Sequence, residues 1–264
     1  MIKIIRTSLL LIRIDFLIQR KYKLELITSI LSKMSIYIIF LLLAIFTDYY
    51  TGMKFFYSKF ILTGIVVDSI LSSALYTPSL VFIQEYKTGR LDLKMILPLS
   101  IKELIYALTL KGMLWSVVEN SIFIVCWFYF LIYTLEKNVV LSLHFIIVTI
   151  LALYSCLELG FLCLGITLSL EIRGFNPMVL LIRTFFVIVS GIYFPLEILP
   201  TYLRVFSLIS PYYYLANIIR GIKMNVSHLM IMIITAILYA IIGSFSLNTG
   251  IKNMIRKGLW QRWL

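Results

Sequence analysis

The stretch VVLSLHFIIVTILALYSCLELGFLCLGITLSL, Val139 to Leu170, decides the fold class of this chain. It contains one acidic residue, Glu158, and neither lysine nor arginine. Crossing the hydrocarbon core of a bilayer takes about 20 consecutive apolar residues in a helix, and this stretch is longer than that. A strand of a membrane barrel would have about ten residues and would alternate apolar with polar side chains. The stretch therefore predicts a membrane-spanning α-helix.

Other apolar runs of similar character lie on either side of this stretch. The six predicted spans are Ser29–Thr47, Phe60–Phe82, Leu104–Tyr133, Val139–Leu170, Met178–Phe194 and Leu229–Gly250. The composition agrees, because 61% of the residues are hydrophobic and 14% are charged, with a mean hydropathy of +1.01. Such values exclude an ordinary soluble globular protein. We predict an all-α integral membrane protein in which residues 1–264 form a single transmembrane domain.

The formal net charge of +12 is distributed unevenly along the chain. Outside the spans, basic residues concentrate before the first span, between the second and third, and after the sixth. Cytoplasmic loops of membrane proteins carry such an excess of lysine and arginine. We therefore assign most of the charge to topology, place both termini in the cytoplasm, and expect a multi-pass protein of the cell (plasma) membrane with no nucleic-acid partner.

The N-terminal segment, residues 1–28, carries arginines at a regular spacing. Arg6, Arg13 and Arg20 recur every seven residues among apolar side chains, which places them on one helical face. This pattern favours an amphipathic helix on the inner membrane surface, with its arginines toward anionic lipid headgroups. The alternative is a simple cytoplasmic extension of the first span. Arg13 and Asp15 interrupt the apolar run, so we expect no signal peptide and a retained N-terminus.

The connection between the second and third spans, residues 84–103, is the longest loop predicted to be cytoplasmic. Gly89 and Pro98 mark two breaks, and the leucines between them make the loop too apolar to be purely solvated. Ser100 and Glu103 have the spacing of a capping box, which predicts the start of the next helix. The short mixed element ahead of it suits docking of a soluble partner. A loop that dips its leucines into the lipid surface is the alternative.

The segment from Gly191 to Gly221 lies on the outer side and is interrupted by prolines. The spacing of apolar and polar residues from Pro195 onward predicts one amphipathic helix. Ser210, as the N-cap, and Pro211, at the first helical position, predict the start of a second. Both are too short to span a bilayer, and the cluster Tyr212–Tyr214 is typical of the headgroup level. We predict a pair of short helices, residues 195–223, that forms a lid at the outer leaflet.

The order of these two segments resembles the ABC-2 family of ABC exporter permeases. The residues that carry the resemblance are, in the loop, Glu85, Gly89, Leu91, Pro98, Ser100, Glu103 and the later Lys111, and, in the outer segment, Gly191, Phe194, Pro195, Leu199, Pro200, Leu203, Pro211, Tyr214 and Arg220. Arg90 and Asp92 differ from the small polar residue and the glutamate that are common at those positions.

The resemblance implies a six-helix half-transporter that pairs with a second permease subunit and with two copies of an ATP-binding subunit. The loop would be the coupling helix, with Glu85, Gly89, Arg90, Leu91, Asp92, Pro98, Ser100 and Glu103 as its coupling residues. The outer pair would be re-entrant helices near the exit, marked by Gly191, Pro195, Glu197, Pro200, Arg204 and Pro211. The sequence contains no GxxxxGK[ST] motif, so we expect ATP and Mg²⁺ to be bound by the partner and this chain to be no enzyme.

Ionisable residues also lie within the predicted spans: Lys33, Asp68, Lys111, Glu119, Glu158 and Arg183. A charge facing lipid at mid-bilayer costs about 3 kcal/mol or more, so these side chains are expected to face the bundle or to reach a surface. Lys111, Glu158 and Arg183 have similar predicted depths, which favours an ion-pair cluster over a substrate contact. No basic residue is expected at the depth of Asp68 and Glu119. We predict that these two, with Tyr212, Tyr213 and Tyr214, line the translocation pathway.

Function follows as a prediction from these features. We expect a permease subunit of an exporter for a lipophilic or amphipathic substrate, such as a drug, a lipid or a glycolipid-like molecule, in contact with membrane lipid. The aromatic fraction of 15% and ten methionines suit such cargo but also ordinary membrane packing. The alternatives are an ATP-independent membrane enzyme or assembly factor acting on lipids, and a secondary transporter. His144 and His228 are far apart and the three cysteines fall within spans, so we expect neither a metal site nor a disulfide framework.

Overall fold

The computed structural model describes residues 7–14, 23–52, 56–95, 99–134, 143–170, 177–222 and 224–256, and within these ranges the chain is helical and has no strand. Residues 7–14 form a short first helix. The elements that follow are α2 (Lys23–Thr51), α3 (Phe56–Lys87), α4 (Arg90–Met95), α5 (Ile101–Thr134), α6 (Leu143–Leu170), α7 (Pro177–Val189), the 3₁₀ turn η1 (Leu196–Ile198), α8 (Thr201–Ser207), α9 (Pro211–Ile219) and α10 (Val226–Arg256). The predicted all-α class is confirmed.

The longest helices coincide with the predicted spans. Among the described residues, the helices Phe56–Lys87, His144–Leu170 and Val226–Arg256 are long and apolar enough to cross a membrane. Tyr37–Thr51 and Pro177–Val189 are shorter apolar helices. These apolar helices satisfy their backbone hydrogen bonds internally, as a bilayer core requires. The chain is therefore a membrane protein. The count of six spans and the cytoplasmic position of both termini stay predictions.

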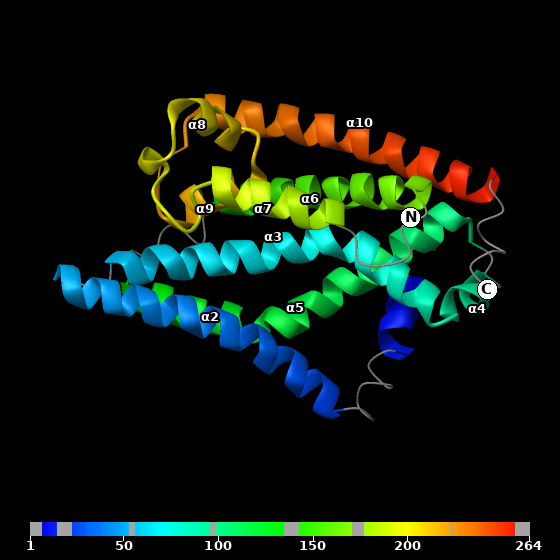
Figure 1. The fold of residues 1–264 in the computed structure, drawn as a ribbon, viewed down its shortest axis with the longest axis horizontal. Helices are drawn as coiled ribbons and strands as arrows, with labels where there is room; N and C mark the ends of the chain where they lie inside the picture. The colour runs from blue at the N-terminus through cyan, green and yellow to red at the C-terminus, as the bar shows by residue number, and fades with distance from the viewer. Residues whose placement is uncertain are drawn as a thin grey trace.

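The long helices pack as a layered bundle (Figure 1). The central pair is α3 and α6, with α10 packed on α6, α5 packed on α3, and α2 lying along α3 at the opposite edge from α10. The short helices α8 and α9 gather at one end, and α4 lies at the other. This arrangement separates the two sequence segments of interest, the loop around α4 and the outer segment around α8 and α9, by the length of the bundle.

Small residues set the close contact between α6 and α10. A Cβ atom added at Gly165 would collide with the carbonyl group of Ser246, and one added at Gly250 would collide with the carbonyl of Gly165. A Cβ at Gly243 would likewise meet the backbone of Glu158. In lipid, where no hydrophobic effect drives helices together, small residues let backbones approach and gain dispersion contacts. The sequence therefore encodes this helix pair through glycines spaced along both partners.

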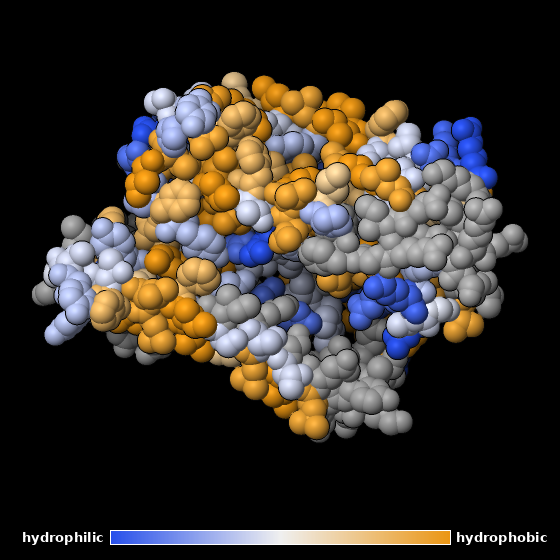
Figure 2. Space-filling model, in the orientation of Figure 1, coloured by the Kyte–Doolittle hydropathy of each residue, from blue (hydrophilic) through white to orange (hydrophobic). Residues whose placement is uncertain are grey.

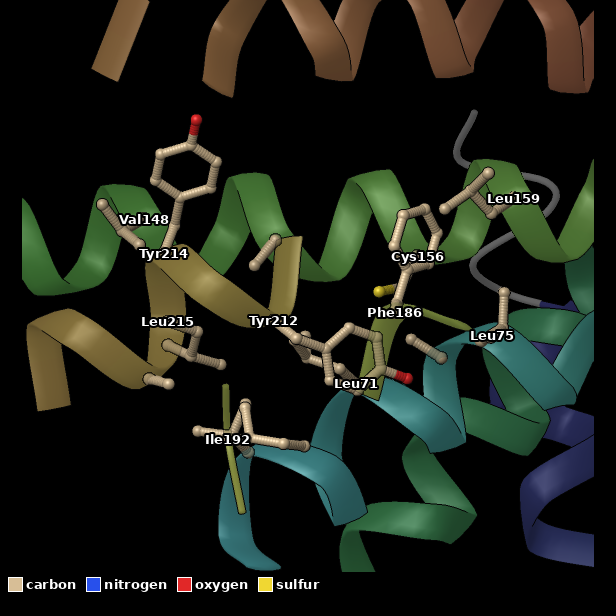
Figure 3. Close-up of a cluster of buried hydrophobic side chains, with 14 of the residues drawn as sticks. Leu71, Leu75, Val148, Cys156, Leu159, Phe186, Ile192, Tyr212, Tyr214 and Leu215 are labelled. Atoms are coloured by element: carbon tan, nitrogen blue, oxygen red, sulfur yellow. The ribbon is translucent and has the colours of Figure 1, made fainter. Parts of the chain in front are cut away.

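Two buried clusters hold the bundle together. The first joins α3, α6, α7 and α9, and Figure 3 shows its larger members, which are Leu71, Leu75, Val148, Cys156, Leu159, Phe186, Ile192, Tyr212, Tyr214 and Leu215. The second lies toward the end that holds α4 and consists of Leu11, Val81, Phe82, Leu91, Leu104, Ile105, Leu108, Phe161, Leu164, Leu168, Leu247 and Met254. The short helix of residues 7–14 and α4 are thereby both attached to the membrane helices.

The N-terminal helix differs in part from the predicted interfacial geometry. Leu11 is buried in the second cluster, so one face packs on protein rather than on lipid. Leu9, Leu10 and Ile14 are exposed on the remaining surface, as is Arg13. The other two arginines of the predicted stripe, at positions 6 and 20, lie outside the described residues.

The outer segment departs from the predicted single helix after Pro195. It forms the turn η1 and then, after a break, the separate helix α8. Leu199 is extended, with φ −74° and ψ 143°, because the ring of Pro200 disfavours a helical conformation in the residue before it. The second predicted start is confirmed: Ser210 is the N-cap of α9 and Pro211 occupies its first turn, although the Ser210 side chain makes no capping hydrogen bond.

Candidate functional site

The loop after α3 folds into a short amphipathic helix at the end of the bundle. α3 ends at Lys87, and Gly89 turns the chain with φ +66°, a conformation that favours glycine. In α4, Leu91 is buried in the second cluster, whereas Leu93 is 69% exposed. Arg90 is exposed beside it. The side chain of Asp92 and the whole of Pro98 lie outside the described residues. One side of α4 is thus fixed to the bundle and another faces outward.

A single carboxylate fixes α4 to two membrane helices. Glu85, near the end of α3, is buried, and its Oε1 atom accepts a hydrogen bond from Lys111 Nζ of α5 at 2.9 Å. The same oxygen pairs with Lys94 Nζ of α4 at 2.5 Å. The pair of ammonium groups offsets the cost of burying the carboxylate. α3, α4 and α5 therefore meet at one ionic contact.

The third helix of this junction begins as the sequence predicts. Ser100 Oγ and Ser100 N–H both donate to Glu103 Oε2, at 2.9 and 2.8 Å, and Glu103 N–H donates to Ser100 Oγ at 3.3 Å. These reciprocal bonds form a capping box that satisfies free N–H groups at the helix start. Leu99 packs against the cluster that contains Leu104. The capping box defines where α5 begins relative to α4.

A polar cluster occupies the interior where α3, α7 and α9 meet. Asp68 of α3 is fully buried, and Arg183 of α7 binds it through two hydrogen bonds, from Nη2 to Oδ2 at 2.6 Å and from Nε to Oδ1 at 3.1 Å. Arg183 Nε also donates to Ser72 Oγ at 2.9 Å. Tyr193 OH donates to Asp68 Oδ2 at 2.9 Å, and Tyr212 OH lies 3.2 Å from Ser72 Oγ. Such a satisfied network defines the relative rotation of the helices that contribute to it.

The Asp68–Arg183 pair corrects the expectation that no base lies at the depth of Asp68. α7 begins at Pro177 and crosses α3 so that the long guanidinium side chain reaches the carboxylate. The Asp68 side chain is 1% exposed, whereas that of Arg183 is 31% exposed. The carboxylate is thus closed off, whereas the guanidinium group is partly exposed. Figure 2 shows that one face of the molecule is largely apolar, with smaller hydrophilic patches.

The predicted cluster of Lys111, Glu158 and Arg183 is wrong. Lys111 pairs with Glu85, and Arg183 pairs with Asp68. Glu158 of α6 is buried against α10 and is hydrogen-bonded to Tyr154. Depth along a helix does not identify ion-pair partners, because the rotation of each helix decides which side chains meet.

The other acid predicted to line the pathway lies on α5. Glu119 is half-buried, and its Oε1 accepts a hydrogen bond from Trp115 Nε1 at 3.1 Å, one turn earlier on the same helix. The structure does not bring Glu119 into the polar cluster around Asp68. A pathway role for either acid stays a prediction.

Two of the three tyrosines of α9 lie inside the bundle rather than at its surface. Tyr212 and Tyr214 are fully buried in the first cluster, where the Tyr212 ring stacks 6.5 Å from that of Phe186 (Figure 3). Tyr214 OH donates to the Leu208 carbonyl at 2.6 Å. Tyr213 is half-buried. The rings fill the space between helices because α9 packs on α6 and α3 through this side.

Arg220 fastens the end of α9 to the rest of the outer segment. Its Nη1 and Nη2 donate to the carbonyls of Gly191 and Ile192, at 3.1 and 2.6 Å, and its guanidinium lies 3.5 Å from the centre of the Phe60 ring. Burial lowers the pKa of Arg220 to about 10, so the group stays charged at neutral pH. Gly64 lies so close that an added Cβ would collide with the Ile192 carbonyl.

The remaining residues of the outer motif shape turns. Gly191 has φ +65° and no space for a Cβ beside Leu196. Arg204 Nε donates to the Leu199 carbonyl at 2.7 Å, and its Nη2 donates to the Glu197 carbonyl. Pro195, Pro200 and Pro211 precede or open η1, α8 and α9, respectively. These residues therefore fix the backbone conformation of the segment that holds η1, α8 and α9.

The comparison with protein families decides the assignment. The family model described as ABC-2 type transporter matches residues 8–224, from the N-terminal helix to the end of the segment that holds α8 and α9. The chain belongs to this family. A comparison with curated proteins finds no match. Members of the ABC-2 family form the membrane domain of a transporter and generally act with a separate ATP-binding subunit.

The family match covers both ends of the helix bundle of this ABC-2 permease. It includes the junction of α3, α4 and α5 as well as α8 and α9, whereas α10 lies beyond it. Sequence reasoning identified both segments but missed the Glu85–Lys94–Lys111 contact and the Asp68–Arg183 pair. The only available signal was the presence of opposite charges within or beside apolar runs, which does not say which charges pair.

Proposed function

We propose that this permease is the membrane-spanning subunit of an ATP-driven exporter and works as a dimer of permease subunits. Two copies of a separate ATP-binding subunit would bind ATP and Mg²⁺ and supply the energy. The observation that carries the proposal is the attachment of α4: an outward-facing leucine and arginine stand on a helix whose other side is bound to α3 and α5.

The Glu85 junction supports mechanical coupling. Lys94 of α4 and Lys111 of α5 share one carboxylate oxygen of α3, so displacement of α4 by a docked subunit would move the end of α3 and the part of α5 around Lys111. Leu91 adds an apolar contact with the same helices. Coupling of this kind needs a contiguous packed network, and the residues around α4 provide one.

The transport pathway would pass the partly exposed side of the Asp68–Arg183 pair. Arg183 is partly exposed beside a mainly apolar cluster, which suits a lipophilic or amphipathic substrate better than a small hydrated ion. A second permease subunit would cover the exposed side of Arg183, and the substrate would leave past α8 and α9. Both termini and α4 would lie in the cytoplasm.

Purification of the tagged permease from its native cells in mild detergent tests the proposal. We expect an ATP-hydrolysing protein to co-purify and to be lost from the Leu93→Glu variant. Tyr202→Glu is the matched control, because Tyr202 is also 69% exposed but lies on α8 at the opposite end of the bundle. Retention of the ATPase by Leu93→Glu would contradict docking on α4. A preparation free of any ATPase would favour a membrane enzyme or a secondary transporter.

A further inference from the structure

A hollow on the surface shared by α6 and α10 lies apart from the polar cluster and from α4. Its volume is about 470 Å³, and its lining includes Tyr106, Tyr154, Glu158, Ile237, Ile241 and Ser244. This volume lies within the range of about 300–1,000 Å³ that is usual for small-molecule sites. Ile237 and Ile241 are exposed on α10, at the edge of the bundle (Figure 1), so in a bilayer the hollow opens toward acyl chains.

The acidic group of the hollow lacks a charged partner. Glu158 is 7% exposed, and its Oε2 atom has no hydrogen-bond partner in the described part of the chain. Within the same part, Glu158 forms no salt bridge, although Lys102 at the start of α5 exerts an electrostatic attraction on it. A carboxylate at this position in a membrane is costly unless it is paired, and an unsatisfied buried oxygen requires an explanation.

The surrounding side chains have the chemistry that recognises an organic cation. Tyr106 and Tyr154 line the hollow, and aromatic faces attract positive charge, as the Tyr106 ring does for Lys102 Nζ at 6.0 Å. The Glu158 carboxyl group, when ionised, adds a negative charge. The isoleucines of α10 supply aliphatic walls for an apolar substituent. Small hydrated cations lack any favourable contact with such walls.

We propose that this hollow binds a lipophilic organic cation, which reaches it from the bilayer, with its charged centre beside Glu158 and the tyrosine rings and its apolar part along α10. The site is distinct from the pathway proposed above. Binding here requires neither ATP nor a partner subunit, so its test and the test of the exporter proposal fail independently.

Equilibrium binding of tetraphenylphosphonium to the purified full chain in phosphatidylcholine nanodiscs tests this site. We expect saturable binding that weakens about tenfold or more in Glu158→Gln, which keeps the shape of the side chain and removes its charge. Asp48→Asn, at a similarly buried acid of α2 that does not line the hollow, is the matched control and should bind like the unmodified chain. The neutral probe triphenylphosphine oxide should bind equally to all three proteins.

Two results would overturn the proposal. One is equal affinity of the unmodified chain and Glu158→Gln for tetraphenylphosphonium. The other concerns Ala240→Phe, which fills the hollow while leaving the carboxylate in place and remains informative if Glu158→Gln fails to fold. This variant should lose binding of the cation while it elutes as the same monodisperse species. Unchanged binding by a well-folded Ala240→Phe would exclude the hollow as the site.

Discussion

At the scale of single residues, the described part of the chain brings charges together from distant positions. Asp68 and Arg183 are 115 residues apart, yet they share two hydrogen bonds, and the carboxylate accepts a further one from Tyr193. Removing one member of a buried ion pair leaves the other charge buried and uncompensated. This destabilises the fold by more than the intact pair stabilises it. Substitution of either residue alone should therefore destabilise the bundle.

Substitution at this pair has a predictable order of effects. Arg183→Met should destabilise the purified permease by about 3 kcal/mol or more, because the Asp68 carboxylate remains buried. The double variant Asp68→Asn with Arg183→Met should recover a large part of that loss. Thermal unfolding in detergent measures both, with Glu119→Gln as a control for a half-buried acid. If the double variant loses more stability than Asp68→Asn and Arg183→Met lose together, the two side chains are not a buried pair.

At the scale of elements, α4 is a short helix that depends on its attachments. It has six residues, too few for a stable isolated helix, so its order comes from Leu91 and from the contact of Lys94 with Glu85. Its neighbour α5 has 34 residues and begins at a capping box.

Glu85→Gln should loosen α4 selectively. Removing the charge leaves two ammonium groups without their shared partner, and we expect hydrogen exchange across residues 90–95 to rise about tenfold or more. Exchange in α10 should stay unchanged. Lys87→Gln, at an exposed position two residues later, is the control. If exchange in α4 is the same in Glu85→Gln and in the unmodified chain, the carboxylate does not fasten this helix.

At the scale of the whole molecule, the two ends of the bundle are connected by helices packed through small residues. α10 follows α6 along its length, and the glycines between them leave no space for a Cβ. A change at one such contact must move a complete helix, since both backbones are rigid. Stability of the bundle is therefore sensitive to one methyl group there.

Gly165→Ala should destabilise the permease although alanine is the better helix former. The added methyl group meets the Ser246 backbone, and overpacking of this kind costs about 1–3 kcal/mol, more than the helix propensity gained. The melting temperature of the purified protein should fall. Asn248→Ala, on the exposed side of α10, should leave it nearly unchanged. A melting temperature of Gly165→Ala equal to that of the unmodified chain would show that the two helices are less closely packed.

The sequence alone determined the features that depend on neighbouring residues. Apolar runs predicted the positions of the long helices because every backbone group in a bilayer must be satisfied within its own helix. Gly89, Ser100 and Pro211 marked breaks and starts through local φ preferences and capping bonds. The single helix predicted from Pro195 was wrong, because Pro200 disfavours a helical conformation at Leu199.

Only the tertiary structure decided which side chains meet. The partners of Lys111 and Arg183, the burial of Tyr212, and the hollow beside Glu158 all depend on how each helix is rotated and on which helix lies next to it. Apolar runs contain little information about rotation, because lipid and protein interior are similarly apolar surroundings. The fold class was therefore readable along the chain, whereas the sites arise from contacts between segments far apart in it.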